Sequence, residues 1–485
     1  MRNFAALDDL TKAIPSLPRS FYRSANKAAV YKASREDAVS KPIERSLQEL
    51  YAADPERADS VVFGRRVDAT RRGFLGGAGL AGMGAAVGAS IPFASDMPAA
   101  LIPAALAQGA PAATASAGPQ ILDFPGKERG LVVLGDRPLV AETPEHLLDD
   151  ETTPTAKFFI RNNGQIPSAA ADPSAWTLTI DGEVNSRLEL TLADLKARLA
   201  AKTYRMVLEC GGNGRSFFQP QARGNPWTNG GAGCAEWTGI PLAEVLKAAG
   251  IKDSARYTAH YGADPHLSGD TTKESLSRGV PIHKAMEEHG LIVFAMNGEA
   301  LTNIHGGPVR LVIPGWPGSL SHKWLTRITL RDREHDGQGM TGTSYRLPNK
   351  PMVPGGKADE KDFRILESMP VRSITTSPAN GTKLPAGTRE VQLRGAAWAG
   401  DLTVARVDVS FDFGQTWSQT VLAPPRNRYD WVRWTSTIKL PSDGYYEIWS
   451  RATDSNGKMQ PPVAPGWNPQ GYGGNAVHRL AILVG

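Results

Sequence analysis

The sequence has few of the side chains that build common redox and disulfide sites. Among 485 residues only Cys210 and Cys234 are cysteines, and no Cys-x-x-Cys-His segment occurs. Attachment of a c-type haem needs that segment, and a disulfide scaffold needs more than two cysteines. The chain also shows no obvious ligand set for flavin or an iron–sulfur cluster. Any one-electron carrier must therefore belong to another protein. Cys210 and Cys234 could in principle pair with each other, but a cysteine committed to a metal cannot, so with Cys210 as a metal ligand we expect Cys234 to be a buried free thiol.

A concentrated excess of positive charge is also missing. The net charge is +5, but residues 1–107 hold fourteen Lys and Arg against eleven Asp and Glu, which leaves 40 against 38 in the remainder. Nucleic-acid binding needs a basic face, so this balance argues against a nucleic-acid partner. The charged and hydrophobic fractions, 21% and 41%, are ordinary for a globular protein, and the length allows two or three domains.

Long hydrophobic runs are absent apart from a Gly/Ala-rich segment over 76–93, which is too short and too small in its side chains for a stable membrane span. Arg71-Arg72 precedes it, and Ala105-Leu-Ala107 follows as an A-x-A-like cleavage site. A chance arginine pair before an ordinary apolar helix is the alternative. The order of the three parts predicts that residues 1–107 are a leader with a twin-arginine signal and that the protein is exported to the periplasm.

The remaining chain divides by composition and pattern. Residues 108–135 are rich in Gly, Pro and Ala and are predicted to be a linker or surface arm. Residues 136–348 alternate strands and short helices without a regular βαβ period, which predicts a mixed α/β domain of the α+β class. A Pro/Gly-rich linker follows at 348–358. Residues 369–485 show short alternating strands at a spacing of about ten residues, which predicts an all-β immunoglobulin-like sandwich.

Several local elements can be predicted within the first of these domains. Strands are expected over 157–163, 176–183, 204–208 and 309–313, the last after an Asn-Gly turn and a His-Gly-Gly-Pro loop. Thr191 and Asp194 form a capping-box pattern that begins one helix. A second helix is expected over 240–250, with proline in its first turn and glycine at its end.

Cys210 lies in the turn Leu208-Glu-Cys-Gly-Gly-Asn-Gly-Arg215, directly after a predicted strand. Glycine allows backbone to approach closely, as a turn that brings a thiolate to a metal requires. A buried structural thiol is the competing interpretation and is common for free cysteines. His305 and Arg310 flank a glycine/proline turn, which suits a phosphate-bearing ligand but also ordinary surface turn chemistry.

The wider stretch from Glu209 to Gly239 resembles the sulfite oxidase family of molybdenum enzymes. In that family a Cys-Ala-Gly-Asn-x-Arg-like turn carries the cysteine that binds molybdenum, and a tryptophan and a Gly-Ala-x-x-x-Ala-x-Trp-x-Gly segment follow. Here these are 210–215, Trp227 and 231–239. The resemblance extends over about residues 130–480, with further matching segments at 157–163, 291–315, 318–324 and 343–348.

The resemblance implies a molybdopterin cofactor whose molybdenum is bound by two pterin sulfurs and by the thiolate of Cys210. It assigns four residues to the substrate pocket, namely Arg161, Arg215, Trp227 and Tyr345. It assigns eight residues to the pterin, namely Asn162, Asn163, Asp264, His305, Arg310, Ser321, His322 and Lys323. Asn163 stands where the family often has histidine, and Gln470 where it usually has arginine. Arg479 is matched to an arginine that reaches the active site.

Two enzymatic functions follow from the resemblance. One is oxidation of sulfite to sulfate with electrons passed to a separate c-type cytochrome, and we favour it. The other is the molybdenum subunit of a sulfane-sulfur dehydrogenase acting on carrier-bound sulfur in thiosulfate oxidation. Gly214 stands where a vertebrate-like pattern often has a second arginine, and fewer charges would suit a bulkier or less anionic substrate. The resemblance also implies a homodimer through the last domain or a complex with a cytochrome subunit.

A third reading belongs to another class, a cofactor-free exported binding or scaffold protein. Such a protein would need only the sandwich domain. It would not explain why Cys210, Arg215, His305 and Arg310 stand in matching blocks.

Overall fold

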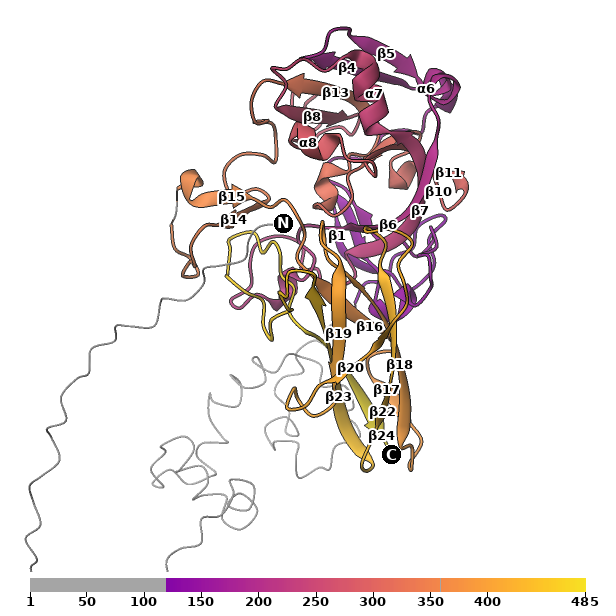
Figure 1. Cartoon of the computed structure of the whole chain (residues 1–485), viewed down its shortest axis with the longest axis vertical. Coiled ribbons are helices and arrows are strands. Elements are labelled where there is room, and N and C mark those ends of the chain that lie inside the picture. Colours follow the sequence, from indigo (N-terminus) through magenta and orange to yellow (C-terminus); the bar gives the residue numbers. More distant parts are fainter. Residues whose placement is uncertain (1–118, 358) are drawn as a thin grey trace, which may run out of the picture. The chain divides into compact units, whose positions relative to one another are not determined.

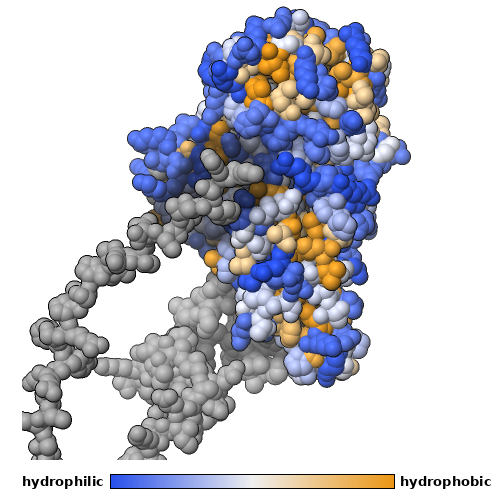
Figure 2. Space-filling view, viewed as in Figure 1, coloured by the Kyte–Doolittle hydropathy of each residue, from blue (hydrophilic) through white to orange (hydrophobic). Residues whose placement is uncertain are grey.

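The computed structural model describes residues 119–357 and 359–485 (Figure 1). The predicted leader, its twin-arginine segment and residues 108–118 of the predicted linker lie outside these ranges. Within them, no helix has the length and apolar character needed to cross a membrane. Hydrophobic residues on the face seen in Figure 2 form separate patches among polar ones, as is usual for a protein surface.

A small antiparallel sheet comes first, and it corrects one prediction. Its strands are β1 (Val132–Asp136), β2 (Leu139–Glu142) and β3 (Ile160–Arg161). The second half of the segment predicted as a linker is therefore folded. Leu122 and Leu131 are buried against Ala141 and Ile160, so these apolar side chains hold the segment onto the sheet despite its glycines and prolines.

Two five-stranded sheets form most of the α+β domain. The first has the order β11-β10-β7-β6 with β12 beside β10, and its strands are β6 (Lys202–Glu209), β7 (Ala232–Pro241), β10 (Leu291–Met296), β11 (Glu299–Ala300) and β12 (Arg310–Val312). The second has the order β5-β4-β13-β8-β9, and its strands are β4 (Thr177–Gly182), β5 (Leu188–Thr191), β8 (Tyr257–Gly262), β9 (Ser277–Arg278) and β13 (Leu325–Arg331).

Three α-helices accompany the sheets, α6 (Leu192–Arg198), α7 (Leu242–Ala249) and α8 (Ile282–Ala285). The capping box of Thr191 and Asp194 is present, which confirms the predicted helix start. Gly250 ends α7 in the left-handed region with φ 69°, as its position in the sequence predicted. Short 3₁₀ turns connect the strands, and they are η2 (Glu145–Leu148), η3 (Pro173–Ala175), η4 (Arg215–Phe217), η5 (Asn303–His305), η6 (Gly318–Leu320) and η7 (Glu360–Asp362).

After the hairpin of β14 (Arg346–Pro348) and β15 (Phe363–Ile365), the chain forms the predicted all-β sandwich. One sheet has the order β16-β18-β22-β21, with β16 (Arg372–Ser377), β18 (Glu390–Trp398), β21 (Val421–Leu422) and β22 (Val432–Lys439). The other has the order β17-β24-β23-β19-β20, with β17 (Thr382–Leu384), β19 (Val404–Ser410), β20 (Ser418–Gln419), β23 (Gly444–Asp454) and β24 (His478–Val484). The α+β fold with a β-sandwich is thus confirmed.

A buried ion pair joins the end of β6 to the sandwich. The Glu209 carboxylate, 3% exposed, accepts hydrogen bonds from Arg372 Nε at 2.8 Å, Trp398 Nε1 at 2.7 Å and Asn213 Nδ2 at 3.0 Å. Arg372 also donates to Asn213 O at 3.1 Å. Because Glu209 directly precedes Cys210, this network fixes both ends of the turn that carries the cysteine.

Replacing Arg372 with methionine should strongly destabilise the fold, because it leaves the Glu209 carboxylate buried without its cation. Removing one partner of a buried ion pair costs about 3–5 kcal/mol. Urea unfolding measures the loss. Lys439→Gln is the control, since the Lys439–Glu390 pair is exposed and 3.9 Å apart and should contribute about 1 kcal/mol or less. Equal shifts in the two variants would contradict the role of the buried pair.

Candidate active site

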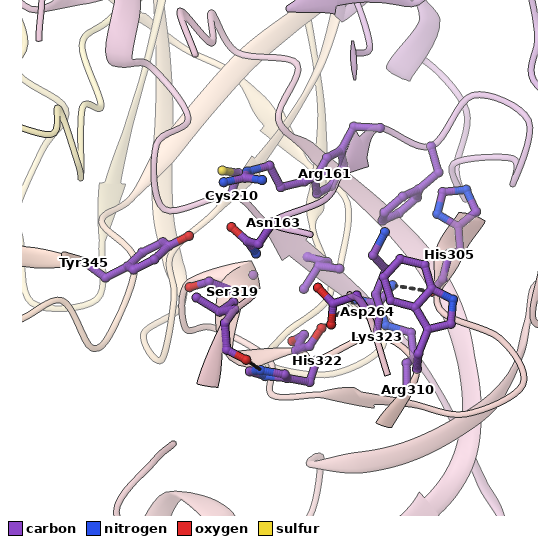
Figure 3. A pocket seen from close by; sticks show the side chains of 17 residues that line it. Arg161, Asn163, Cys210, Asp264, His305, Arg310, Ser319, His322, Lys323 and Tyr345 are labelled. Atoms are coloured by element: carbon purple, nitrogen blue, oxygen red, sulfur yellow. Dashed lines mark hydrogen bonds between the residues drawn. The ribbon is translucent and has the colours of Figure 1, made fainter. Parts of the chain in front are cut away.

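A cavity with an empty volume of about 700 Å³ lies among the α+β sheets, and its polar lining comes from many separate elements (Figure 3). Ten of the thirteen residues that the sequence singled out line it, although they are spread from β3 to the start of β14. They are Arg161, Asn163, Cys210, Asp264, His305, Arg310, Ser321, His322, Lys323 and Tyr345. The fold therefore brings the segments of the resemblance to one place.

The cysteine turn is closed by backbone hydrogen bonds. Cys210 N–H donates to Gly231 O at 2.8 Å, and Asn213 N–H donates back to Cys210 O at 2.9 Å. Gly214 has φ 81°, and a Cβ there would lie 2.1 Å from Gly474 O, so only glycine fits. The thiol is 7% exposed and lines the cavity close to Arg161 (Figure 3).

Positive side chains gather at one end of the cavity. Arg310 donates to His305 O at 2.9 Å and to Ser321 O at 3.0 Å, and burial lowers its pKa to about 9. Lys323 donates to Ile304 O at 3.0 Å and to Asn162 Oδ1. Burial and then the charge of Arg310 hold the Lys323 pKa well below its usual value. These cations cost energy to bury unless an anion balances them.

Lys127 belongs to the same positive end, and the sequence gave no signal for it. Its Nζ donates to Thr155 O at 2.7 Å and to Phe158 O at 2.6 Å, and it lies 2.6 Å from His305 Nε2. Burial lowers its pKa to about 7. It lies in the segment predicted as a linker, where a single lysine among glycines and prolines matches no motif.

Burial shifts the pKa values of the carboxyl and imidazole groups of the lining so that their neutral forms are favoured. Burial raises the pKa of Asp264 to about 6 and lowers that of His322 to about 4. His322 Nε2 lies 3.2 Å from Leu276 O, while its Nδ1 has no hydrogen-bond partner within the protein. Ser321 Oγ accepts from Ile313 N–H at 3.0 Å. The lining thus offers several donors and little negative charge to an anionic ligand.

At the other end, Arg161 and Tyr345 face the thiol. Arg161 Nη1 is buried and has no hydrogen-bond partner within the protein. The ring of Tyr345 stacks on Tyr472 with centroids 4.8 Å apart, and its hydroxyl points into the cavity (Figure 3). Tyr345 has φ 50°, an uncommon conformation for a residue with a side chain, and such strain is often found at functional sites.

Three of the predicted residues lie behind the lining. Arg215 donates to Gln470 O at 2.6 Å and to Asn225 O at 2.8 Å, so its charge is turned to backbone carbonyls. Trp227 is fully buried, edge-on to Phe159. Asn162 donates to Leu139 O at 2.9 Å and supports Lys323. These side chains support the cavity wall, whereas the sequence had placed Arg215 and Trp227 on the pocket itself.

Arg479, which the resemblance matched to an active-site arginine, is not among the residues that line the cavity. Its guanidinium stacks 3.9 Å from the Trp449 ring and donates to Pro462 O at 3.0 Å, away from the cavity lining. By contrast Arg278, which no motif indicated, lies directly behind the lining. It donates to Ser319 Oγ at 2.6 Å, and its guanidinium carbon is 4.3 Å from the centre of the Tyr345 ring.

Cys234, the second cysteine, is a buried free thiol, as predicted. Its Sγ donates to Asp430 Oδ1 at 3.3 Å, and burial, followed by the nearby Asp430 charge, holds its pKa well above the usual value. This thiol is therefore a structural group and differs from Cys210, which lines the cavity.

The donor set fits a pterin-bound metal. A thiol that lines a cavity suits a soft metal, and buried cations with unpaired donors suit a phosphate. The residues that would hold such a group are Cys210 for the metal and, for the pterin and its phosphate, Arg310, Lys323 and the imidazole of His305 with their neighbours.

Comparison with known proteins agrees with the geometry. Residues 163–339 match the oxidoreductase molybdopterin binding domain, and residues 364–485 match the Mo-co oxidoreductase dimerisation domain. Sulfite oxidase of Gallus gallus is 33% identical over 367 residues, which are 73% of this chain and 78% of that protein. The mitochondrial sulfite oxidase of Homo sapiens is 32% identical over 381 residues, 75% of this chain and 67% of that protein.

A solved structure shows the same fold. The sulfane dehydrogenase SoxCD from Paracoccus pantotrophus has a TM-score of 0.61 at 24% identity and covers 81% of this chain and 96% of that one. From the matched domains, the relatives and the cavity around Cys210, the chain belongs to the sulfite oxidase family of molybdopterin enzymes and is a molybdenum-dependent oxidoreductase.

Proposed function

We propose that this protein oxidises sulfite to sulfate in the periplasm and passes the electrons to a separate c-type cytochrome. One observation carries the proposal, namely that Cys210, Arg161 with its unpaired Nη1, and Tyr345 line a single cavity. The names of the relatives that cover most of this chain, sulfite oxidases of Gallus gallus and Homo sapiens, support the same substrate.

The bound molybdenum cofactor would supply two-electron redox chemistry with transfer of oxygen to sulfur. The net reaction of sulfite with water gives sulfate, two protons and two electrons. Because a haem accepts one electron at a time, two transfers to the cytochrome complete each turnover. The absence of a haem-attachment segment in this sequence is why we assign the acceptor to another protein.

The chain's own residues bind and orient the oxyanion. Arg161 Nη1 donates a charge-assisted hydrogen bond to one oxygen, and Tyr345 donates its hydroxyl to another. Phe158 and Phe159 form an apolar part of the lining that excludes water, which strengthens both interactions. Arg161 and Cys210 line the same cavity, so an oxyanion bound by the guanidinium shares that cavity with the metal ligand (Figure 3).

A second function, oxidation of sulfane sulfur on a carrier protein, is favoured by a different feature. A broad groove with an empty volume of about 2140 Å³ lies between the β14–β15 hairpin and the sandwich. Tyr472 lines this groove and stacks on Tyr345 at the cavity. A protein-borne substrate needs such an open surface, whereas sulfite does not.

Export and assembly complete the proposal. The twin-arginine pattern at Arg71-Arg72 supports export as a folded, cofactor-loaded protein. The match of residues 364–485 to a dimerisation domain supports a homodimer, and complex formation with a cytochrome subunit is the alternative.

Replacing Cys210 with serine should lower the oxidation rate by more than about 100-fold, since even changes to the outer partners of metal ligands cost about 10- to 100-fold. The rate is measured as reduction of cytochrome c by sulfite, together with molybdenum per protein. Cys234→Ser is the matched control and should keep near-normal activity. Unchanged rate and molybdenum content in Cys210→Ser would refute the assignment of the metal ligand.

The two substrates can be separated directly with the cofactor-loaded protein. We expect sulfite to reduce cytochrome c with a kcat/KM at least about tenfold above that for a sulfur-carrier protein loaded with sulfane sulfur, because a free oxyanion reaches Arg161 unhindered. Stopped-flow absorbance at the haem band of the cytochrome gives both rates. A higher value for the loaded carrier would replace the first function with the second.

Export can be tested by changing Arg71 and Arg72 to lysine. The paired change should retain the protein in the cytoplasm, because the twin-arginine route reads that pair. Cell fractionation and immunoblotting measure the result, with Arg65→Lys/Arg66→Lys as the matched control, since that second arginine pair lies further from the apolar run over 76–93. Normal export of the Arg71/Arg72 variant would rule out this route.

A further inference from the structure

We propose that Arg278 is a further substrate-positioning residue. Its guanidinium lies behind the part of the cavity wall that Tyr345 and Ser319 form, and no carboxylate of the described residues balances its positive charge. This charge attracts an oxyanion to that side of the cavity. The inference rests on the proposed function in one respect, that the substrate is an oxyanion of sulfur.

The position of Arg278 ties its charge to two lining residues at once. It is the last residue of β9 and is 1% exposed. Its Nη1 donates to Ser319 Oγ at 2.6 Å, and its guanidinium carbon lies 4.3 Å from the centre of the Tyr345 ring. Ser319 and Tyr345 both line the cavity (Figure 3). The charge is therefore one side chain away from the space that the substrate would enter.

No carboxylate neutralises this charge within the described part of the chain. Two other buried arginines are paired with carboxylates, Arg205 Nη2 with Asp430 at 2.7 Å and Arg372 Nε with Glu209 at 2.8 Å. Buried Arg215 and Arg310 instead donate to backbone carbonyls. Arg278 makes no such pair among residues 119–357 and 359–485, and its Nε has no hydrogen-bond partner within the protein. Burying a guanidinium in this state is costly, so a compensating ligand is the simplest reason for its presence.

The electrostatic surroundings agree with a free cation. Burial lowers the pKa of Arg278 to about 10, and the neighbouring phenols of Tyr345, Tyr472 and Tyr257 oppose that shift. Arg346 adds a further repulsion. At neutral pH the guanidinium therefore keeps its charge. Hydroxyl groups surround it, and these can align as dipoles but cannot cancel a full charge.

Arg278 also adds a second guanidinium group next to the cavity. Arg161 brings one guanidinium with an unpaired Nη1 to the wall that holds Cys210. Arg278 places its guanidinium behind the part of the wall that contains Tyr345. Two positive groups in a water-poor cleft focus the field and raise the local concentration of an anion. Because Arg278 acts through Ser319 and Tyr345, its expected effect is on substrate affinity.

The test compares Arg278→Gln, which keeps a donor for Ser319, with Arg278→Lys, which keeps the charge. Both are made in the full, cofactor-loaded protein, and molybdenum content and thermal midpoint are checked. We expect Arg278→Gln to raise KM for sulfite and the Kd of sulfate, measured by calorimetry, by about tenfold or more, with kcat within about twofold. Arg278→Lys should recover most of the affinity. Arg278→Met is a second neutral variant, and it should behave as Arg278→Gln does.

Two results would overturn the proposal. In one, the neutral variants keep the affinity for sulfate and the KM of the parent. In the other, the glutamine and lysine variants lose kcat and thermal stability equally, which indicates a structural role alone. Sulfate binding remains measurable even if the parent does not oxidise sulfite. A failure of the proposed function is therefore distinguishable from a failure of the role of Arg278.

Discussion

The buried carboxylate of Glu209 is the interaction on which the rest of the site depends. It receives donors from Asn213 in the cysteine turn and from Arg372 and Trp398 in the sandwich. Full pairing is what makes a buried charge tolerable, and it also makes the geometry rigid. The turn around Cys210 therefore has its position set by a domain that contributes no residue to the cavity lining.

Positive charge without nearby counter-charge is the second organising feature. Arg161, Arg310, Lys323 and Lys127 approach the cavity from different strands and loops, and burial depresses the pKa of the last three. Asp264 is the carboxyl group in the lining, and burial raises its pKa towards neutrality. Burying such a lining is unfavourable by itself and becomes favourable when an anionic cofactor balances the charge.

Sequence reasoning succeeded where function is carried by short contiguous motifs. The Cys210 turn, the His305 block and Tyr345 were found because they resemble motifs of the sulfite oxidase family, and the fold brings all three to one cavity. It failed for residues whose role depends on contacts with distant parts of the chain. Lys127 and Arg278 have no local signature, and their partners lie far along the chain. Arg215 matched its motif, but the fold turned its guanidinium to backbone carbonyls.

The closure of the cysteine turn by distant residues has a consequence for biosynthesis. Arg215 donates to the carbonyl of Gln470, 255 positions further along, and Gly473 N–H donates to Gly211 O at 3.1 Å. During translation these contacts can form only after the ribosome has passed residue 473, so the turn that carries Cys210 matures late. A cofactor can meet the finished turn only when the segment around 470–473 has been made and folded back onto it.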